Sequence, residues 1–244
     1  GIKGKGQFAS SSGNVITVNE LLDVYEPEIV RYLFAGTRPN REFAISFDVD
    51  VIKMYEDFDK TERIYYGLQK VKEKEQGKHK IIYELSYIGK IQKNIPYQAS
   101  FRHLTMILQI NELDIDRTIS YCEHELKNEH DKKRLRQRAR CAVNWLNKYA
   151  PEDYKFTVQK KCQVTLSKEE KKILHQLADK LSEKEWTDKD LHEEIYVLCK
   201  NNDFPTKDFF KLAYNVIVNK DKGPKLASFI SEIGRERVAK LLKS

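Results

Sequence analysis

The sequence predicts a mainly α-helical fold, in which a small α+β module is followed by two helical bundle units. Gly and Pro account for only 10 and 6 of the 244 residues, which favours long regular elements with short connections. Apolar residues make up 40% of the chain, enough to bury a core. Most of them recur at helical spacing, and only two short segments have the character of strands.

After a Gly- and Ser-rich loop at residues 1–15, the predicted module covers residues 16–95. Thr17 and Glu20 have the spacing of a capping box, so we expect a helix to start there. A second helix is expected from Pro27 to Gly36, because Pro suits a first helical turn and Gly a C-terminal cap.

The β part of the module depends on two short segments. Residues 43–47 alternate like a strand, and residues 81–85 are rich enough in apolar side chains to be its partner. Between them, Asp48 or Asp50 is expected to cap a helix. The charged residues 70–80 are expected to form a solvated connection.

Residues 96–165 form the first predicted helical unit. One helix is expected around Leu104, another from near Asp114, and a long one from about Asn128 to Tyr149. The second unit, residues 166–244, opens with a capping box at Ser167 and Glu170. Its expected helices lie near residues 168–182, 188–201, 206–219 and 224–242.

Charge and cysteine usage limit the function classes. A net charge of +7 favours a polyanionic partner such as RNA, although many basic proteins bind no nucleic acid. The cysteines are far apart and the six histidines have no ligand spacing, so we predict no metal site and reduced thiols in the cytoplasm. No apolar stretch reaches the ~20 residues that span a membrane. No arrangement of residues indicates a catalytic site, so we assign no catalytic residue.

The most basic segment is residues 132–140, which carry six cations at helical spacing. One row holds the candidate RNA contacts Lys133, Arg136 and Arg140, and a neighbouring row holds Arg134 and Arg138. These cations either contact RNA phosphates or pair with carboxylates, and the nearest in sequence are Glu123, Glu125, Glu129 and Asp131. Lys225 and Arg235 are further candidate contacts in the last unit.

The loop near the start of the chain contains the candidate phosphate-binding residues Ser10, Ser11, Ser12, Gly13 and Asn14. Small hydroxyl residues and a Gly let backbone N–H groups approach a phosphate. The alternative is a flexible linker, and the spacing is not that of a P-loop.

Residues 7–15 resemble the Lys-Met-Ser-Lys-Ser loop of class I aminoacyl-tRNA synthetases. Further stretches resemble one subgroup, the class I lysyl-tRNA synthetases, over nearly the whole chain and in the family's order: residues 17–28, 37–40, 47–59, 83–86 and 223–229. The loop departs from the family pattern, since Gln7, Phe8 and Ser10 stand where the family has Lys, Met and Lys. The family's His-x-Gly-His signature is not found in the 244 residues.

The resemblance implies a stem-contact module at residues 16–95 and a helix-cage anticodon-binding unit at residues 166–244. It implies that the loop at residues 10–14 closes over ATP, and that the intact cytoplasmic ligase attaches lysine to tRNA(Lys) for protein biosynthesis. We expect the chain to be a C-terminal fragment that is inactive without its catalytic half. Candidate aromatic contacts to RNA bases are Phe204, Phe209, Phe210, Tyr214 and Trp186. The alternatives are another class I synthetase, such as glutamyl-tRNA synthetase, and a helical protein-interaction domain.

Overall fold

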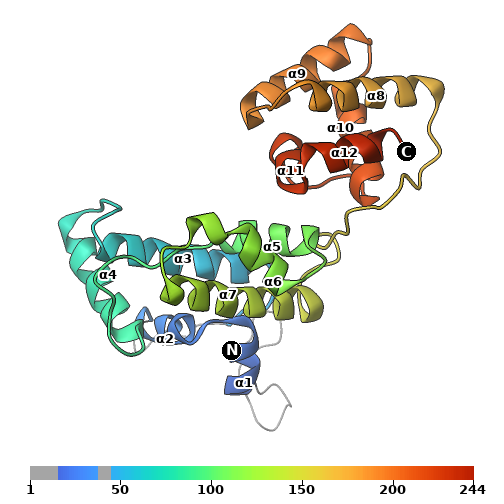
Figure 1. Ribbon diagram of the computed structural model, residues 1–244. Helices are drawn as coiled ribbons and strands as arrows, with labels where there is room; N and C mark the ends of the chain where they lie inside the picture. Colours follow the sequence, from blue (N-terminus) through green and yellow to red (C-terminus); the bar gives the residue numbers. More distant parts are fainter. Residues whose placement is uncertain (1–15, 38–44) are drawn as a thin grey trace. The chain divides into compact units, whose positions relative to one another are not determined.

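A computed structural model describes residues 16–37 and 45–244, and these residues form twelve α-helices, one 3-10 helix and no β-strand (Figure 1). The prediction of a mainly α fold is therefore confirmed. The chain divides into two compact units, residues 1–155 and residues 156–244. Among the described residues, no helix has both the length and the apolar character needed to cross a lipid bilayer.

The helices of the first unit include the elements that the sequence predicts from its caps. They are α1 (Val18–Val24), α2 (Pro27–Ala35), α3 (Asp50–Tyr65), α4 (Glu73–Ser86), α5 (Phe101–Ile110), α6 (Ile115–Tyr121), η2 (Glu123–Glu125) and α7 (Glu129–Lys148). The capping box at Thr17 and Glu20 is formed in both directions, and Gly36 is the C-terminal cap of α2. Asp114 caps α6 by accepting a hydrogen bond from the Arg117 backbone N–H.

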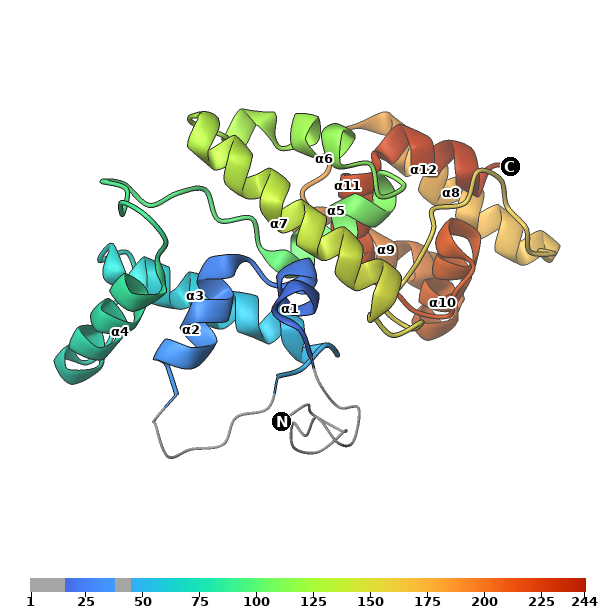
Figure 2. The same cartoon turned by 90° about the horizontal axis from the view of Figure 1, so that it is seen from below.

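The core of the first unit lies around α7, which packs against α1, α5 and α6 (Figures 1 and 2). Aromatic rings form its centre. Tyr55 stacks on Phe101 with ring centroids 4.0 Å apart, and Phe101 meets the edge of Trp145 at 5.8 Å. All three side chains are almost completely buried, so they fix α3, α5 and α7 to one another.

The prediction of a strand at residues 81–85 is wrong. Residues 81–85 lie in α4, which also takes up most of the predicted connection at residues 70–80. Ile82 and Tyr83 are buried while Ile81 and Leu85 are exposed, which is a helical pattern that a run of five residues is too short to reveal. Of the other predicted strand, residues 43 and 44 lie outside the described residues, Ile45 forms an isolated β-bridge, and residues 46 and 47 have no regular structure.

The start of α3 also differs in detail from the prediction. Val49 is its N-terminal cap residue and makes no side-chain capping bond. The Asp48 side chain instead accepts a hydrogen bond from the Val49 backbone N–H at 2.7 Å.

The second unit is a bundle of short helices. They are α8 (Lys168–Glu183), α9 (Asp188–Asn201), α10 (Thr206–Val218), α11 (Leu226–Ile233) and α12 (Arg235–Leu242). The capping box at Ser167 and Glu170 is formed, as predicted. Thr187 caps α9 by accepting a hydrogen bond from the Asp190 backbone N–H. The predicted helix at 224–242 is divided at Gly234, whose φ of 95° cannot continue a right-handed helix. Within this unit α8 packs on α12, and α9 packs on α8, α10 and α11.

Candidate nucleic-acid interface

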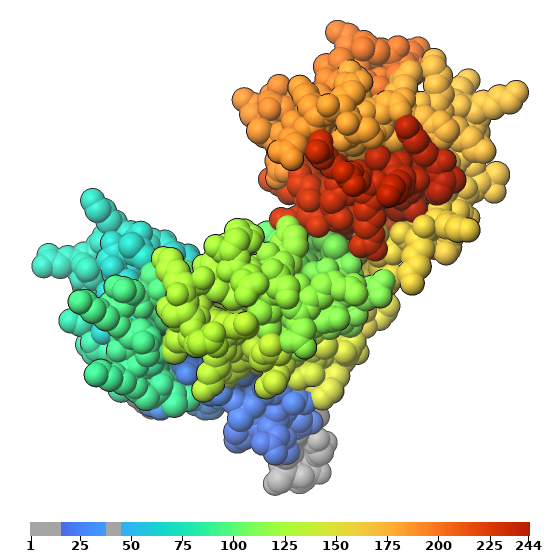
Figure 3. All heavy atoms as spheres, viewed as in Figure 1, coloured from blue at the N-terminus to red at the C-terminus, as the bar shows by residue number. Residues whose placement is uncertain are grey.

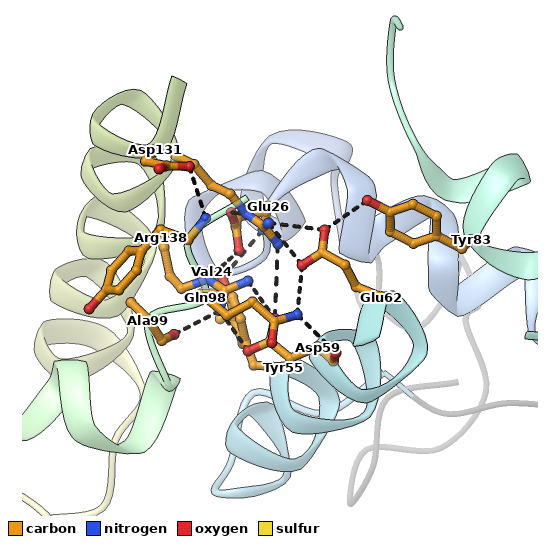
Figure 4. A network of polar contacts seen from close by, with 12 residues as sticks. Val24, Glu26, Tyr55, Asp59, Glu62, Tyr83, Gln98, Ala99, Asp131 and Arg138 are labelled. Carbon is orange, nitrogen blue, oxygen red and sulfur yellow. Dashed lines mark hydrogen bonds and ion pairs between the residues drawn. The ribbon is translucent and has the colours of Figure 1, made fainter. Parts of the chain in front are cut away.

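One side of α7 is held by a buried network of charged groups (Figure 4). The Arg138 side chain is only 1% exposed, and its Nε donates a hydrogen bond to Glu26 at 2.7 Å. Its two terminal nitrogens donate to the two carboxylate oxygens of Asp59 at 2.8 and 2.9 Å. Arg138 also donates to the backbone carbonyl of Ala99 at 2.7 Å. Its guanidinium group thus makes four hydrogen bonds inside the protein.

Arg134, one turn earlier, completes the network through Glu62. Its Nη1 donates to both oxygens of Glu62, at 3.0 and 2.9 Å. Glu62 also accepts hydrogen bonds from the Tyr83 hydroxyl and the Gln98 amide, each at 2.7 Å. No buried side-chain nitrogen or oxygen among the described residues lacks a hydrogen-bond partner. The network joins α3, α4 and α7 to the residue that precedes α2.

The electrostatics of the network follow from its composition. Three carboxylates, Glu26, Asp59 and Glu62, face the two guanidinium groups of Arg134 and Arg138. Burial raises the pKa of Glu26 above its usual value, although both arginines oppose the shift. Burial, and then the negative charge of Glu62, raise the pKa of Tyr83, which keeps its hydroxyl protonated as a donor.

The structure thus separates the two rows of cations on α7. Arg134 and Arg138 form the internal ion pairs that the sequence left as an alternative. Their partners are not the nearby acidic residues Glu123, Glu125, Glu129 and Asp131, but carboxylates that precede them by 72 to 112 residues. A row of arginines at the edge of an apolar helical stripe was the available signal for this burial, but it does not identify the partners.

The row with the candidate RNA contacts points the other way. Lys133 and Arg140 are exposed and form no ion pair with any described residue. Arg136 lies between them and pairs with Asp116 at 2.7 Å, where both side chains remain accessible to water. In Figure 3 this middle part of the chain, coloured yellow-green, is at the surface of the first unit. The structure places the three predicted residues on α7, and their contact with RNA stays a prediction.

Two hollows lie beside the N-terminal half of α7. The smaller, about 260 Å³, is lined by Lys133 and Gln137 of α7 and by Tyr87 after α4. The larger, about 800 Å³, is lined by the cations Lys93 and Lys127 but also by the acids Glu129 and Asp131. Pro96 and His130 line both hollows, so the two are neighbours next to the exposed end of the row.

In the second unit the predicted contacts Lys225 and Arg235 lie at the starts of α11 and α12. Lys225 is exposed and forms no ion pair within residues 156–244. Arg235 lies 3.7 Å from Glu185, a carboxylate that is itself almost fully exposed. An ion pair in that setting contributes little stability, so a stronger anion can replace it.

The aromatic candidates of the second unit divide by burial. Phe209 is completely buried and Tyr214 almost so, with its hydroxyl bonded to the Pro224 carbonyl, which makes both of them core residues. Trp186 donates a hydrogen bond to the Lys180 carbonyl and is covered by the Lys184 ammonium, 4.0 Å from the ring centroid. Phe204 and Phe210 are, like Trp186, half-buried.

Sequence reasoning missed two neighbours of Phe210. Tyr196, on α9, is 48% exposed and its ring lies 6.1 Å from that of Phe210. His192, also exposed, lies 5.0 Å from Tyr196. The spacing of four residues between His192 and Tyr196 on a helix was the available signal.

Two parts of the predicted chemistry have different outcomes. The loop Ser10, Ser11, Ser12, Gly13 and Asn14 lies outside the described residues, and its role stays a prediction. The four cysteines are all free thiols, and Cys122, Cys141 and Cys199 are buried, as expected for reduced cysteines.

Comparison with known proteins connects this geometry to a family. Residues 1–89 match the family model of class I (K) tRNA synthetases, and residues 132–244 match that of an anticodon-binding domain. Three similar proteins are named lysine–tRNA ligases. The one from Borreliella burgdorferi is 45% identical over 98% of this chain and 47% of its own length. The one from Treponema pallidum is 40% identical over 99% of this chain and 47% of its own length. The one from Thermococcus kodakarensis is 36% identical over 100% of this chain and 48% of its own length.

The chain spans about half the length of the curated relatives it matches. Both family models agree with the resemblance found in the sequence, in the same order along the chain. Along almost its whole length the chain is similar to class I lysyl-tRNA synthetases, and residues 132–244 match an anticodon-binding domain.

Proposed function

We propose that this chain is the tRNA-binding part of a class I lysine–tRNA ligase, and that the whole enzyme attaches lysine to tRNA(Lys) with ATP. The observation that carries the proposal is the likeness to lysine–tRNA ligases along almost the entire chain. In this role the chain positions the RNA, while the covalent chemistry takes place elsewhere in the whole enzyme. We expect it to act in the cytoplasm.

The two sides of α7 suit this role. The inner side is fixed by the ion pairs of Arg134 and Arg138, so the helix has one position relative to α3 and α4. The outer side presents Lys133 and Arg140, which are exposed and form no ion pair with a described residue. Cations on a rigid support neutralise phosphates without first losing internal partners, and the released counterions favour binding. We therefore assign the phosphate contacts of the first unit to Lys133, Arg136 and Arg140.

In the second unit we assign phosphate contacts to Lys225 and Arg235. The match of residues 132–244 to an anticodon-binding domain supports placing the anticodon arm of tRNA(Lys) on this unit. The bases of an anticodon loop are unpaired, so a protein reads them through stacking and through their polar edges. Exposed aromatic and cationic side chains on the second unit meet this requirement.

The loop of residues 10–14 is assigned to ATP in the whole enzyme. Its three serines and Gly13 offer hydroxyl and backbone donors to phosphate oxygens, in place of the lysines that the family has at Gln7 and Ser10. Substitution of Ser10 to Ser12 by Ala in the full-length enzyme tests this role. We expect slower ATP–pyrophosphate exchange, with tRNA affinity unchanged; an unchanged exchange rate would contradict the assignment.

Equilibrium binding to RNA transcripts tests the function as a whole. We expect the chain to bind tRNA(Lys) more tightly than tRNA(Glu), and more tightly than tRNA(Lys) with a substituted anticodon. Affinity should fall steeply with salt, because binding releases counterions. Equal affinity for the three transcripts would indicate non-specific electrostatic binding. No affinity at low salt would favour a helical protein-interaction domain.

A further inference from the structure

Three aromatic side chains form a cluster on one face of α9 and α10. Tyr196 contributes the central ring, with its centroid 5.0 Å from His192 and 6.1 Å from Phe210. His192 and Phe210 lie 6.2 Å apart, so each ring contacts the other two. Phe210 in turn rests on the buried Phe209, which supports the cluster from below. The helices that carry it pack against each other (Figure 2).

The cluster is unusual for its exposure. In residues 156–244, the large apolar side chains that are strongly exposed are Tyr196 and its neighbour Val197, each at 48%. The other aromatic rings of this unit are buried or half-buried, and Trp186 is covered by Lys184. Leaving Tyr196 and His192 in water gains nothing for the fold, because the core beneath them is already closed by Ile195 and Phe209. A ring held open to solvent on a rigid support is suited to a ligand with a flat aromatic face.

We propose that His192, Tyr196 and Phe210 form a stacking platform for an unpaired base of the tRNA anticodon loop. The proposal deepens the proposed function and depends on it. A base stacks on an aromatic side chain through its π-face, and all four bases have one. The platform would therefore bind a loop nucleotide by stacking, with base identity read by polar groups around it.

The charges around the platform agree with a nucleic-acid ligand. Lys200 follows Tyr196 by one helical turn, and Lys207 precedes Phe210 by three residues. Both are exposed and form no ion pair within the second unit. Of the nearby acids, Glu193 pairs with Lys189 at 3.9 Å, and Asp208 lies in the first turn of α10, where the helix dipole favours it. Two exposed ammonium groups therefore lie toward the turn that joins α9 to α10, at one end of the cluster, where they can meet the phosphate of a stacked nucleotide.

The size of the cluster argues against a protein partner. A stable protein interface buries about 800 Å² on each partner, and three rings that are partly buried already offer much less. A single base is a better match in area. Within residues 156–244, Val197 is the only strongly exposed large apolar residue besides Tyr196, so the apolar patch is small.

The test places 2-aminopurine, a fluorescent base quenched by stacking, in turn at each position of the anticodon loop of a tRNA(Lys) transcript. The variants are Tyr196→Leu, which keeps an apolar side chain but removes the ring, and Tyr196→Phe, which keeps the ring. Val197→Ala is the matched control, because it removes exposed apolar surface from the neighbouring residue. Tyr196 is half exposed on a helix, so Leu, a good helix former, should not disturb folding.

We expect one loop position to be quenched on binding to the wild-type chain, and the quenching to be retained by Tyr196→Phe and Val197→Ala. Tyr196→Leu should lose it and bind about tenfold more weakly. If the wild-type chain binds tRNA(Lys) but Tyr196→Leu binds equally well with the same quenching, the platform is overturned while the proposed function stands. If the wild-type chain does not bind tRNA(Lys) at low salt, both are overturned.

Discussion

Arg138 and Asp59 form a two-point ion pair, with nitrogen–oxygen distances of 2.8 and 2.9 Å, although 79 residues separate them in sequence. Both side chains are buried, and Glu26 accepts a hydrogen bond from the third nitrogen of the same guanidinium group. This pair fixes α7 to α3 while the opposite side of α7 stays open. The cations that form buried ion pairs therefore lie on one side of α7, and the cations that we propose to bind RNA lie on the other.

Arg138→Ala should destabilise the first unit strongly. The substitution leaves the carboxylates of Glu26 and Asp59 buried without their main partner, and breaking a buried ion pair in this way costs about 3–5 kcal/mol. Urea denaturation followed by circular dichroism measures the free energy of unfolding. Arg140→Ala, two residues along the same helix but exposed, should change it by less than about 0.5 kcal/mol. Similar losses for both variants would contradict the division of α7 into two sides.

Glu26 should give stability a specific pH dependence. Burial raises its pKa above the usual value of 4.5, so the folded chain holds this proton more tightly than the unfolded chain. The stability that results is complete below pH 4.5 and is lost as the pH rises through the raised pKa. Relative to Glu26→Gln, the wild type should therefore lose free energy of unfolding as the pH rises above 4.5. A difference between the two proteins that stays constant with pH would show that the pKa of Glu26 is not raised.

Lys133→Ala and Arg140→Ala should each weaken tRNA(Lys) binding across all sequences and lower the slope of log affinity against log salt by about 1. Arg136→Ala should have a smaller effect, because its guanidinium group already pairs with Asp116. Asp116→Asn is the matched control and should strengthen binding or leave it unchanged, since it frees Arg136. Loss of affinity in Asp116→Asn, or an unchanged salt slope in both Lys133→Ala and Arg140→Ala, would remove this row from the interface.

Two glycines should respond to alanine with opposite signs. Gly234 separates α11 from α12 at a φ of 95°, which L side chains rarely adopt, so Gly234→Ala should destabilise the second unit by about 1–3 kcal/mol. Gly77 lies inside α4 with open space around it, so Gly77→Ala should stabilise by roughly 0.5–1 kcal/mol. Thermal unfolding of both variants provides the measurement, and changes of equal sign would contradict the backbone assignments.

Local signals in the sequence were sufficient for most helix boundaries. The capping boxes at Thr17 and Ser167 depend on contacts three residues apart, so a single sequence contains both partners. The segment at residues 81–85 was misread because α4 buries Tyr83 against other helices and leaves Ile81 in water. Such a choice between helix and strand is made by tertiary contacts that no short window includes.

The cations of the candidate site could be predicted from local spacing, but their burial could not, because it depends on tertiary contacts. Spacing on a helix separated Lys133, Arg136 and Arg140 from Arg134 and Arg138. It did not show which of the two rows faces the core. That depends on Glu26, Asp59 and Glu62, whose distance in sequence hides them from any periodicity. Tyr196 was missed because an exposed aromatic residue cannot be told from a buried one by type alone.

Hydroxyl-radical footprinting of tRNA(Lys) with and without the chain tests whether the exposed cations of α7 and the second unit bind separate parts of the RNA. We expect protection of the anticodon loop and of a separate stretch of backbone. Protection of that stretch should weaken in the Lys133→Ala, Arg140→Ala double variant, while the anticodon loop stays protected. A cleavage pattern that the chain leaves unchanged at concentrations above its dissociation constant, or protection spread evenly over the RNA, would contradict this expectation.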